Sequence, residues 1–296
     1  MKYITLFDTV ADFEAAQATL DLPNVSLIEE NMSMSYNPYV PETRLVCKYN
    51  VITTKNETTL LTNYENSIFK SMEVDGVMLD EVVGQYIFDT IGIHTVKYEL
   101  YDEIKLGNQA PVFSLGTSYV NTLIECIIPD SVAYIGQNVF NGCTGLTSII
   151  IPNSVTSIGM AAFSGCTSLT SITIPDSVTG ISDRVFNGCS GLTSIVIPDS
   201  VEYIGLQTFQ KCTSLTSITI GNSVTSIGAW AFNGCSSLTS IVSNAITAPT
   251  IQSDVTFQDI NTGGTLTVPA GSTGYNTWMS TGNYYLGKYN WTKVEQ

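Results

Sequence analysis

Cysteine is the residue of this sequence whose number and spacing most invite a chemical role. Five of the seven cysteines recur every 23 residues, at Cys143, Cys166, Cys189, Cys212 and Cys235. A zinc site needs ligands that converge tetrahedrally, whereas side chains stacked in one column point the same way. The same argument disfavours disulfides between neighbours in the column. We therefore interpret the five as a buried row of thiols.

The two remaining cysteines give no disulfide framework either. Cys126 falls where a partial leading copy of the same pattern, Leu123 to Ile127, would place a core residue. Cys47 stands alone. An odd number of cysteines without evident partners argues against a framework of bridges and suits a reducing or anaerobic setting.

No other cluster of residues indicates catalysis. His94 is the only histidine and falls in a predicted strand, so a Ser-His-Asp or Cys-His arrangement would depend on that residue alone. The glycines fall at turns and form no phosphate-binding loop. We predict a protein that is not an enzyme and has no cofactor. One column offers oxygen ligands for calcium, although Asx turns explain it with fewer assumptions: Asp130, Asn153, Asp176, Asp199 and Asn222.

These columns belong to a tandem repeat with a period of 23 residues and no insertion. Its five copies begin at Ile128, Ile151, Ile174, Ile197 and Ile220. Each contains the spacing L-x-x-I-x-I, in which alternate residues of a strand point to opposite faces. One copy cannot bury its own apolar face, but stacked copies share a continuous core. The fold class predicted is a leucine-rich-repeat solenoid with parallel strands.

The remainder of each copy closes the coil. A proline follows the strand, Val132 and Ile135 with their equivalents form a second short strand, and a glycine such as Gly136 turns the chain. A column of phenylalanines then anchors a short helical or 3₁₀ turn ending in Gly-Cys: Phe140, Phe163, Phe186, Phe209 and Phe232. Lys211 replaces the glycine of that turn in one copy, and it carries strain if the position needs a positive φ.

The motif IPxSVTSIGxxAFxGCTSLTSIT resembles the BspA-type leucine-rich repeats of bacterial and protozoan surface proteins. The resemblance implies a non-enzymatic adhesion or recognition protein that binds protein or glycan ligands on a host or bacterial surface. Two further phrases, LPNVSLIEEN and SYNPYV, resemble leader segments of Bacteroides and phage proteins. They raise the alternative of a structural or receptor-binding component of a phage or prophage tail.

We predict four parts along the chain. Residues 1–42 form a strand-helix-strand leader, with the helix over Thr9 to Leu20, and residues 43–115 form a β-rich module with an Asp75-Gly76 hairpin. The strand from Gly92 to Tyr98 resembles the last strand of immunoglobulin-like surface modules. Residues 116–242 form the repeats, and residues 243–296 resemble the C-terminal cap of the family. The aromatic residues of this cap either cover the last rung or form a ligand-binding patch.

Recognition is expected where the copies differ. The outward strand positions are serine or β-branched residues and give a bland concave face. Variation is concentrated just before the phenylalanine and at the start of the second strand. The candidate ligand-binding residues are therefore Tyr134, Met160, Arg184, Tyr203, Leu206 and Trp230.

Charge and hydropathy restrict the partners and the location. The formal net charge of −15 excludes an electrostatic footprint for nucleic acid or an anionic membrane. No apolar run approaches the length of a membrane span. The repeat resemblance implies an extracellular or cell-surface location, yet residues 1–20 show no secretory pattern. Either the export signal is missing from the sequence as given, or the protein leaves the cell by another route, of which release with a phage virion is one.

Overall fold

The computed structural model describes residues 25–28, 33–36, 44–51, 57–59, 69–79, 85–87, 92–100 and 123–296. The chain divides into two compact units, residues 1–42 and residues 43–296. In the first unit, β1 (Val25–Ile28) pairs antiparallel with β2 (Ser33–Tyr36). The helix predicted over residues 9–20 lies outside the described residues.

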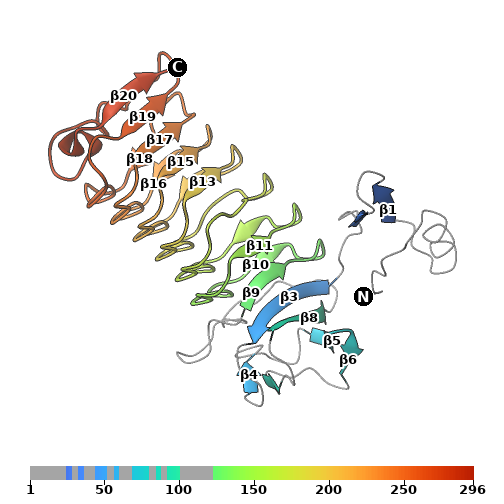
Figure 1. Ribbon diagram of the computed structural model, residues 1–296. Coiled ribbons are helices and arrows are strands. Elements are labelled where there is room, and N and C mark those ends of the chain that lie inside the picture. The colour runs from blue at the N-terminus through green and yellow to red at the C-terminus, as the bar shows by residue number, and fades with distance from the viewer. Residues whose placement is uncertain are drawn as a thin grey trace. The chain divides into compact units, whose positions relative to one another are not determined.

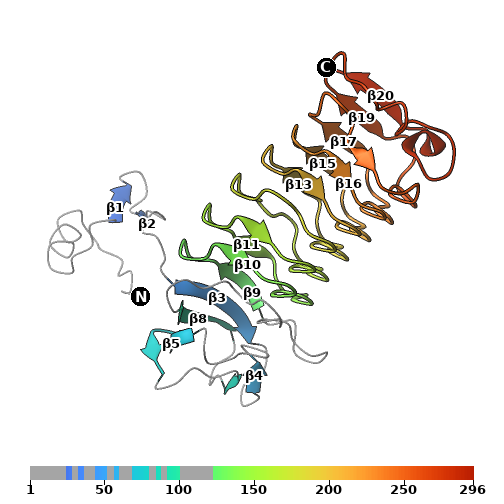
Figure 2. The ribbon, with the colours of Figure 1, turned by 180° about the vertical axis from the view of Figure 1, so that it is seen from behind.

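The second unit contains a β-solenoid of about seven turns with almost no helix, which confirms the predicted solenoid (Figures 1 and 2). Most turns contribute one strand to a main layer of parallel strands, and most also contribute a shorter strand to a second layer. The main strands are β9 (Leu123–Ile127), β11 (Ser148–Ile150), β13 (Ser194–Ile197), β15 (Ser217–Ile220), β17 (Ser240–Ser243), β19 (Thr265–Val268) and β20 (Thr292–Glu295). The short strands are β10 (Tyr134–Ile135), β12 (Ser157–Ile158), β14 (Tyr203–Ile204), β16 (Ser226–Ile227) and β18 (Thr250–Ile251).

Strand pairing follows the repeat period. Ile195 of β13 pairs with Ile218 of β15, which pairs with Ile241 of β17, so equivalent residues lie side by side. These isoleucines and the leucine column are buried, while the alternate serines and β-branched residues face outward as predicted. Residues 171–174 hold the corresponding place between β11 and β13 without regular strand pairing.

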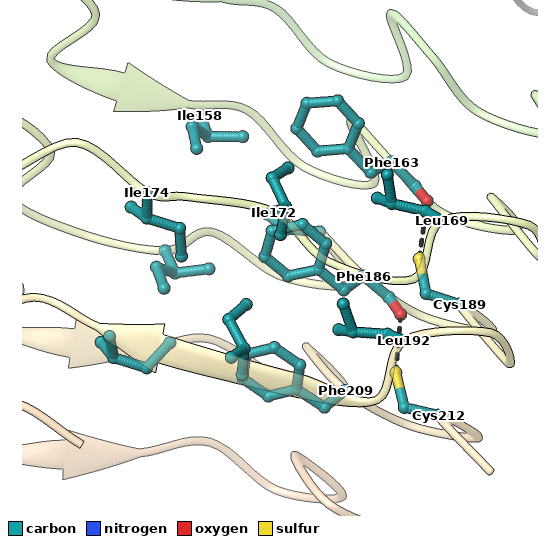
Figure 3. Packing of buried hydrophobic residues seen from close by; sticks show 14 of the residues in the cluster. Ile158, Phe163, Leu169, Ile172, Ile174, Phe186, Cys189, Leu192, Phe209 and Cys212 are labelled. Atoms are coloured by element: carbon teal, nitrogen blue, oxygen red, sulfur yellow. Dashed lines mark hydrogen bonds between the residues drawn. The ribbon is translucent and has the colours of Figure 1, made fainter. Parts of the chain in front are cut away.

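The phenylalanines form a continuous stack through the core (Figure 3). Successive rings from Phe140 to Phe257 have centroids 5.3–5.7 Å apart and are nearly parallel, with angles of 3–9° between their planes. Trp278 ends the stack, with its ring 5.4 Å from that of Phe257. All of these rings are buried, so this column contributes strongly to the apolar core.

Polar side chains form ladders that join each turn to the preceding one. The Cys189 thiol donates to the Phe163 carbonyl oxygen at 3.1 Å, and the Cys212 thiol does the same to Phe186 at 3.1 Å (Figure 3). Outside the core, the Thr193 hydroxyl donates to the Thr170 carbonyl oxygen at 3.1 Å. Backbone carbonyl oxygens inside the core and at its edge therefore accept hydrogen bonds from side chains of the next copy. This explains why cysteine and threonine recur every 23 residues.

The turn around each phenylalanine differs from the expected helical turn. In each of the five regular copies it consists of successive turns in which two residues adopt a positive φ. The first lies two positions before the phenylalanine, and the second lies two positions after it. In the third copy these are Arg184, at φ 58°, and Gly188, at φ 72°. Left-handed residues interrupt a right-handed helix, so no helix forms there.

The strands that precede the solenoid extend its sheet. The order of this six-stranded sheet is β11-β9-β3-β8-β5-β6, in which β3, β8, β5 and β6 are antiparallel to their neighbours. These strands span β3 (Arg44–Val51), β5 (Phe69–Val74), β6 (Val77–Met78) and β8 (Gly92–Leu100), and a separate pair joins β4 (Glu57–Thr59) to β7 (Gln85–Ile87). Because β3 pairs with β9, it covers the edge of the first solenoid strand, and a covered end is what a stack of repeats needs. The immunoglobulin-like resemblance and the four-part division stay predictions.

The predicted hairpin at Asp75-Gly76 is confirmed. Both residues have positive φ, 48° and 88°, and they join β5 to β6. Positive φ at both central residues is the geometry of a type I′ turn, for which Asp-Gly is a preferred pair.

The solenoid continues past residue 242 into a sixth turn. Phe257 follows Phe232 by 25 residues and stacks on it at 5.6 Å, while β19 pairs with β17. Ile260 is buried at the place that cysteine holds in the other turns. The coil then closes through the 3₁₀ helix η1 (Leu286–Tyr289) and β20.

Candidate recognition surface

Three positions in each copy differ from copy to copy, and together they form what we call the variable face. The first is the opening residue of the short strand, and the other two lie in the turn that follows it. The variable face comprises Tyr134, Ser157, Gly180, Tyr203 and Ser226; Gln137, Met160, Asp183, Leu206 and Ala229; and Asn138, Ala161, Arg184, Gln207 and Trp230. All six predicted ligand-binding residues belong to it.

The six residues differ in exposure. Trp230 is 40% exposed, Tyr203 46% and Met160 37%, and Arg184 is also exposed. Tyr134 and Leu206 are half-buried. The parallel pairing of the short strands and of the turns that follow brings the equivalent positions of successive copies into register along the coil.

The third position of the variable face is left-handed in every copy. Its φ is 59° at Asn138, 54° at Ala161, 58° at Arg184, 56° at Gln207 and 55° at Trp230. Only glycine, and to a lesser extent asparagine, adopts this conformation cheaply, and a bulky residue there is a genuine outlier. The sequence showed that this position varies but gave no sign of its conformation.

Tyr203 is held in place by the copy before it. A Cβ atom added at Gly180 would lie 2.3 Å from a ring carbon of Tyr203, so the tyrosine ring lies directly on this glycine. The equivalent residue is serine in two other copies, Ser157 and Ser226. Glycine in one copy therefore makes room for the aromatic ring of the next, which presents a partly exposed phenol in a fixed position.

Hydrogen bonds also fix the turns that carry the variable face. The Asp183 carboxylate accepts from the Leu206 amide at 2.7 Å, and Arg184 Nε donates to Gln207 Oε1 at 2.6 Å. Next to these turns an amide ladder runs from Asn187 to Gln210 and on to Asn233, with both bonds at 3.0 Å. Hydrogen bonds between successive copies thus hold the turns that carry the variable face in fixed positions.

The outward face of the main sheet has a different chemistry. Its side chains are serine at one position and Ile150, Thr173, Val196, Thr219 and Val242 at the other. Ile150 and Val196 are 57% and 61% exposed. These short side chains offer no charge and no aromatic anchor, as the sequence predicted.

The aromatic residues of the C-terminal region mainly cover the last rungs. Tyr275, Trp278 and Trp291 are buried, and the indole nitrogens of the two tryptophans donate to the carbonyl oxygens of Pro249 and Asn261 at 3.1 and 2.8 Å. At the surface, the Lys288 ammonium lies 4.1 Å from the ring centre of the half-buried Tyr284. The covering interpretation is the one that these contacts favour.

The residues first considered for chemistry have structural partners. The four thiols Cys166, Cys189, Cys212 and Cys235 each donate to a phenylalanine carbonyl oxygen of the preceding copy. Burial raises their pKa, to about 12 for Cys189 and Cys235, so they stay protonated and unreactive at neutral pH. The predicted row of buried thiols is confirmed.

The acidic column and the histidine are also engaged in the structure. The Asp199 carboxylate accepts from the amide of Asn222 in the next copy at 2.7 Å. Buried His94 lies with Nδ1 2.6 Å from the Asp75 carboxylate, whose other oxygen accepts from the Thr95 amide at 2.8 Å. No group of His, Cys, Asp or Glu within the described ranges is arranged to hold a metal ion.

Sequence reasoning missed two contacts of the N-terminal strands. It left Cys47 without a partner, but β3 and β9 place its sulfur 3.5 Å from that of Cys126. It also did not connect Asp75 with His94. Both contacts depend on which strands pair across long separations, and no local pattern in the sequence encodes that pairing.

The fold and these columns define a bacterial-type leucine-rich-repeat solenoid. A model of the BspA type leucine rich repeat region matches residues 118–239 and 179–264, with six copies, one more than the fixed period predicts. The chain belongs to this family through these residues, and its proteins are typically surface-associated and bind other molecules. A search of curated proteins finds no match.

Solved structures of similar proteins come from several bacteria. The leucine-rich repeat protein of T. pallidum is 32% identical over 44% of this chain and 66% of its own, with a TM-score of 0.39. A leucine-rich cell surface protein from Faecalibacterium prausnitzii is 32% identical over 52% and 46%, with a TM-score of 0.39. The pneumococcal vaccine antigen PcpA is 20% identical over 58% and 42%, with a TM-score of 0.45. This chain therefore matches about two thirds or less of each of these proteins.

No helix in the described part of the chain is long and apolar enough to cross a bilayer.

Proposed function

We propose that this protein is a non-enzymatic recognition protein of the bacterial cell surface that binds a protein ligand through the variable face. The BspA-type repeats support this role, since proteins of the family are typically surface-associated and binding. The phage-tail alternative has no support from the family match or from the similar structures.

The observation that carries the proposal is a difference between two positions within the same turn. Both adopt a positive φ. The position two residues after the phenylalanine is glycine in four of the five regular copies. The third position of the variable face, two residues before the phenylalanine, is never glycine. A left-handed non-glycine residue costs about 1–2 kcal/mol, so stability alone favours glycine at both positions. For the two exposed side chains kept there at this cost, Arg184 and Trp230, contact with a ligand is the explanation we propose.

The chemistry of the variable face suits a protein surface. Trp230 and Tyr203 are partly exposed rings, Arg184 supplies a cation, and Met160 is an adaptable apolar contact. Tryptophan, tyrosine and arginine are the residues most enriched at energetic centres of protein interfaces. The hydrogen-bonded frame lowers the entropy lost on binding because these residues are displayed in fixed positions.

The proposal is tested by binding of the purified chain to immobilised extracellular-matrix proteins and, in parallel, to an array of glycans. We expect saturable binding to a matrix protein that Trp230→Ala weakens at least tenfold, the usual loss for a central aromatic anchor. Val196→Thr is the matched control, because it changes a still more exposed residue of the main sheet to the type found in the copies on either side, Thr173 and Thr219.

Three results would overturn the proposal. Binding that falls with Val196→Thr but not with Trp230→Ala would move recognition to the main sheet. Binding to glycans alone would replace the protein ligand by a carbohydrate. Absence of binding in both arms would leave the solenoid with the role of a spacer.

A further inference from the structure

Cys47 and Cys126 face each other where the N-terminal strands meet the solenoid. They are register partners on the antiparallel strands β3 and β9, although 79 residues separate them in the sequence. Their sulfur atoms lie 3.5 Å apart, and both side chains are fully buried. Both are free thiols in this structure.

This pair differs from the thiols of the repeat column. The thiols of Cys166, Cys189, Cys212 and Cys235 each donate to a carbonyl oxygen of the preceding copy, so they are directed to backbone acceptors. Cys47 and Cys126 instead contact each other through sulfur.

The backbone geometry of the pair suits a covalent bond. Directly opposed residues of an antiparallel pair have Cα atoms about 4.5–5.5 Å apart, and disulfides span Cα separations of about 4.4–6.8 Å. A bond of about 2.05 Å therefore requires the two sulfurs to approach by roughly 1.5 Å. Small rotations of both side chains achieve this without displacing either strand.

We propose that Cys47 and Cys126 form a reversible disulfide that fastens β3 to the first strand of the solenoid. The oxidant is a small-molecule or protein disulfide. One thiolate attacks it, forms a mixed disulfide and expels one thiolate. The second cysteine thiolate then attacks the mixed disulfide, forms the Cys47–Cys126 bond and expels the other half. Two protein thiols thus lose two electrons, the oxidant is reduced to two thiols, and the two cysteine protons pass to the expelled thiolates.

The environment of the pair determines when this reaction occurs. Burial, and then the neighbouring Cys47, raise the pKa of the Cys126 thiol well above its ordinary value. The folded Cys126 therefore holds little thiolate, and the burial of both sulfur atoms excludes the oxidant, so the bond forms during folding or when β3 separates from β9. Once formed, it prevents β3 from leaving the sheet and exposing the edge of β9 to another chain.

The experiment uses the full chain refolded in a glutathione redox buffer and, separately, under full reduction. Free thiols are blocked with iodoacetamide, and trypsin with chymotrypsin cleaves after Lys48, Tyr134 and Phe140, which places Cys47, Cys126 and Cys143 on separate peptides. Mass spectrometry is expected to identify one linked pair, Cys47 with Cys126. The melting temperature of the oxidised chain should exceed that of the reduced chain by roughly 10 °C, because the bond closes a long loop.

Hydrogen exchange provides a readout that does not depend on global unfolding. Oxidation is expected to slow exchange of the β3 amides at least tenfold, with no such change in Cys47→Ser. Cys189→Ser is the control for loss of a buried thiol and should keep the effect. Refolded chain in which all seven cysteines are alkylated, or in which Cys143 is linked to either partner, would overturn the proposal, as would unchanged exchange after oxidation.

Discussion

Replacing Lys211 by glycine should stabilise this protein, although it removes a long side chain. Lys211 has a φ of 61° at a position where the other copies carry glycine, for example Gly188 at 72° and Gly234 at 75°. The side chain is exposed, and the Lys211 amide donates to the Asn233 carbonyl oxygen at 2.8 Å, a bond that glycine keeps. The substitution therefore relieves backbone strain and removes little packing.

Two opposing terms set the magnitude. The left-handed conformation costs a non-glycine residue about 1–2 kcal/mol. Glycine adds conformational entropy to the unfolded chain, which lowers stability by about 0.4–1 kcal/mol. The net expected gain for Lys211→Gly is about 0.5–1 kcal/mol in the free energy of unfolding, or a rise in melting temperature of roughly 1–4 °C.

Urea denaturation followed by circular dichroism measures this gain, and Gly188→Lys is the matched reverse substitution. It places the same side chain at the equivalent position one copy earlier and should lower the free energy of unfolding by a similar amount. If Lys211→Gly destabilises the protein, or if Gly188→Lys has no effect, the assignment of strain to this column is wrong, and with it the cost argument for the variable face.

Two further outcomes follow from the core. Phe186→Ala removes a ring stacked between Phe163 and Phe209 and should lower the free energy of unfolding by about 3–5 kcal/mol in urea melts. Phe186→Leu, which keeps much of the apolar volume, should lose much less. A loss below about 1 kcal/mol for Phe186→Ala would contradict a close-packed stack. Burial raises the pKa of Cys189 and Cys235 from 9.0 to about 12, so the unfolded chain loses these protons first and stability should fall as pH rises from about 9 towards 12. Each such thiol contributes about 1.4 kcal/mol per pH unit in that window to the slope of the free energy of unfolding against pH. Cys189→Ser keeps a donor to the Phe163 carbonyl oxygen and should remove one thiol's share of that slope. An unchanged slope would contradict this linkage.

The sequence predicts the solenoid well because its core residues repeat. The spacing L-x-x-I-x-I places strands, and equivalent residues such as Ile195 and Ile218 pair in the structure as the period requires. Comparison between copies also predicted strain at Lys211 on the condition that the position needs a positive φ, and the φ of 61° at Lys211 meets that condition. The sequence did not predict the sixth turn because Phe257 follows Phe232 by 25 residues instead of 23, and because Ile260 takes the place of the cysteine.

Features that depend on pairing between distant strands could not be predicted in this way. The contact of Cys47 with Cys126 exists because β3 pairs with β9, and two short apolar strands do not specify their partners in sequence. The variable face is intermediate between these cases. Variation in the sequence identified its six candidate residues. Only the structure showed that the backbone is left-handed at Arg184 and Trp230, and that the ring of Tyr203 packs on Gly180.

The most direct test of recognition through the variable face uses the three tryptophans of the chain. Trp230 is 40% exposed, whereas Trp278 and Trp291 are 1% and 5% exposed. Chain labelled with 5-fluorotryptophan gives one fluorine resonance for each, and Trp230→Phe identifies that of Trp230. On addition of a matrix protein that the chain captures, we expect the Trp230 resonance to shift or broaden while the other two stay in place. Bound protein with an unchanged Trp230 resonance would contradict the account.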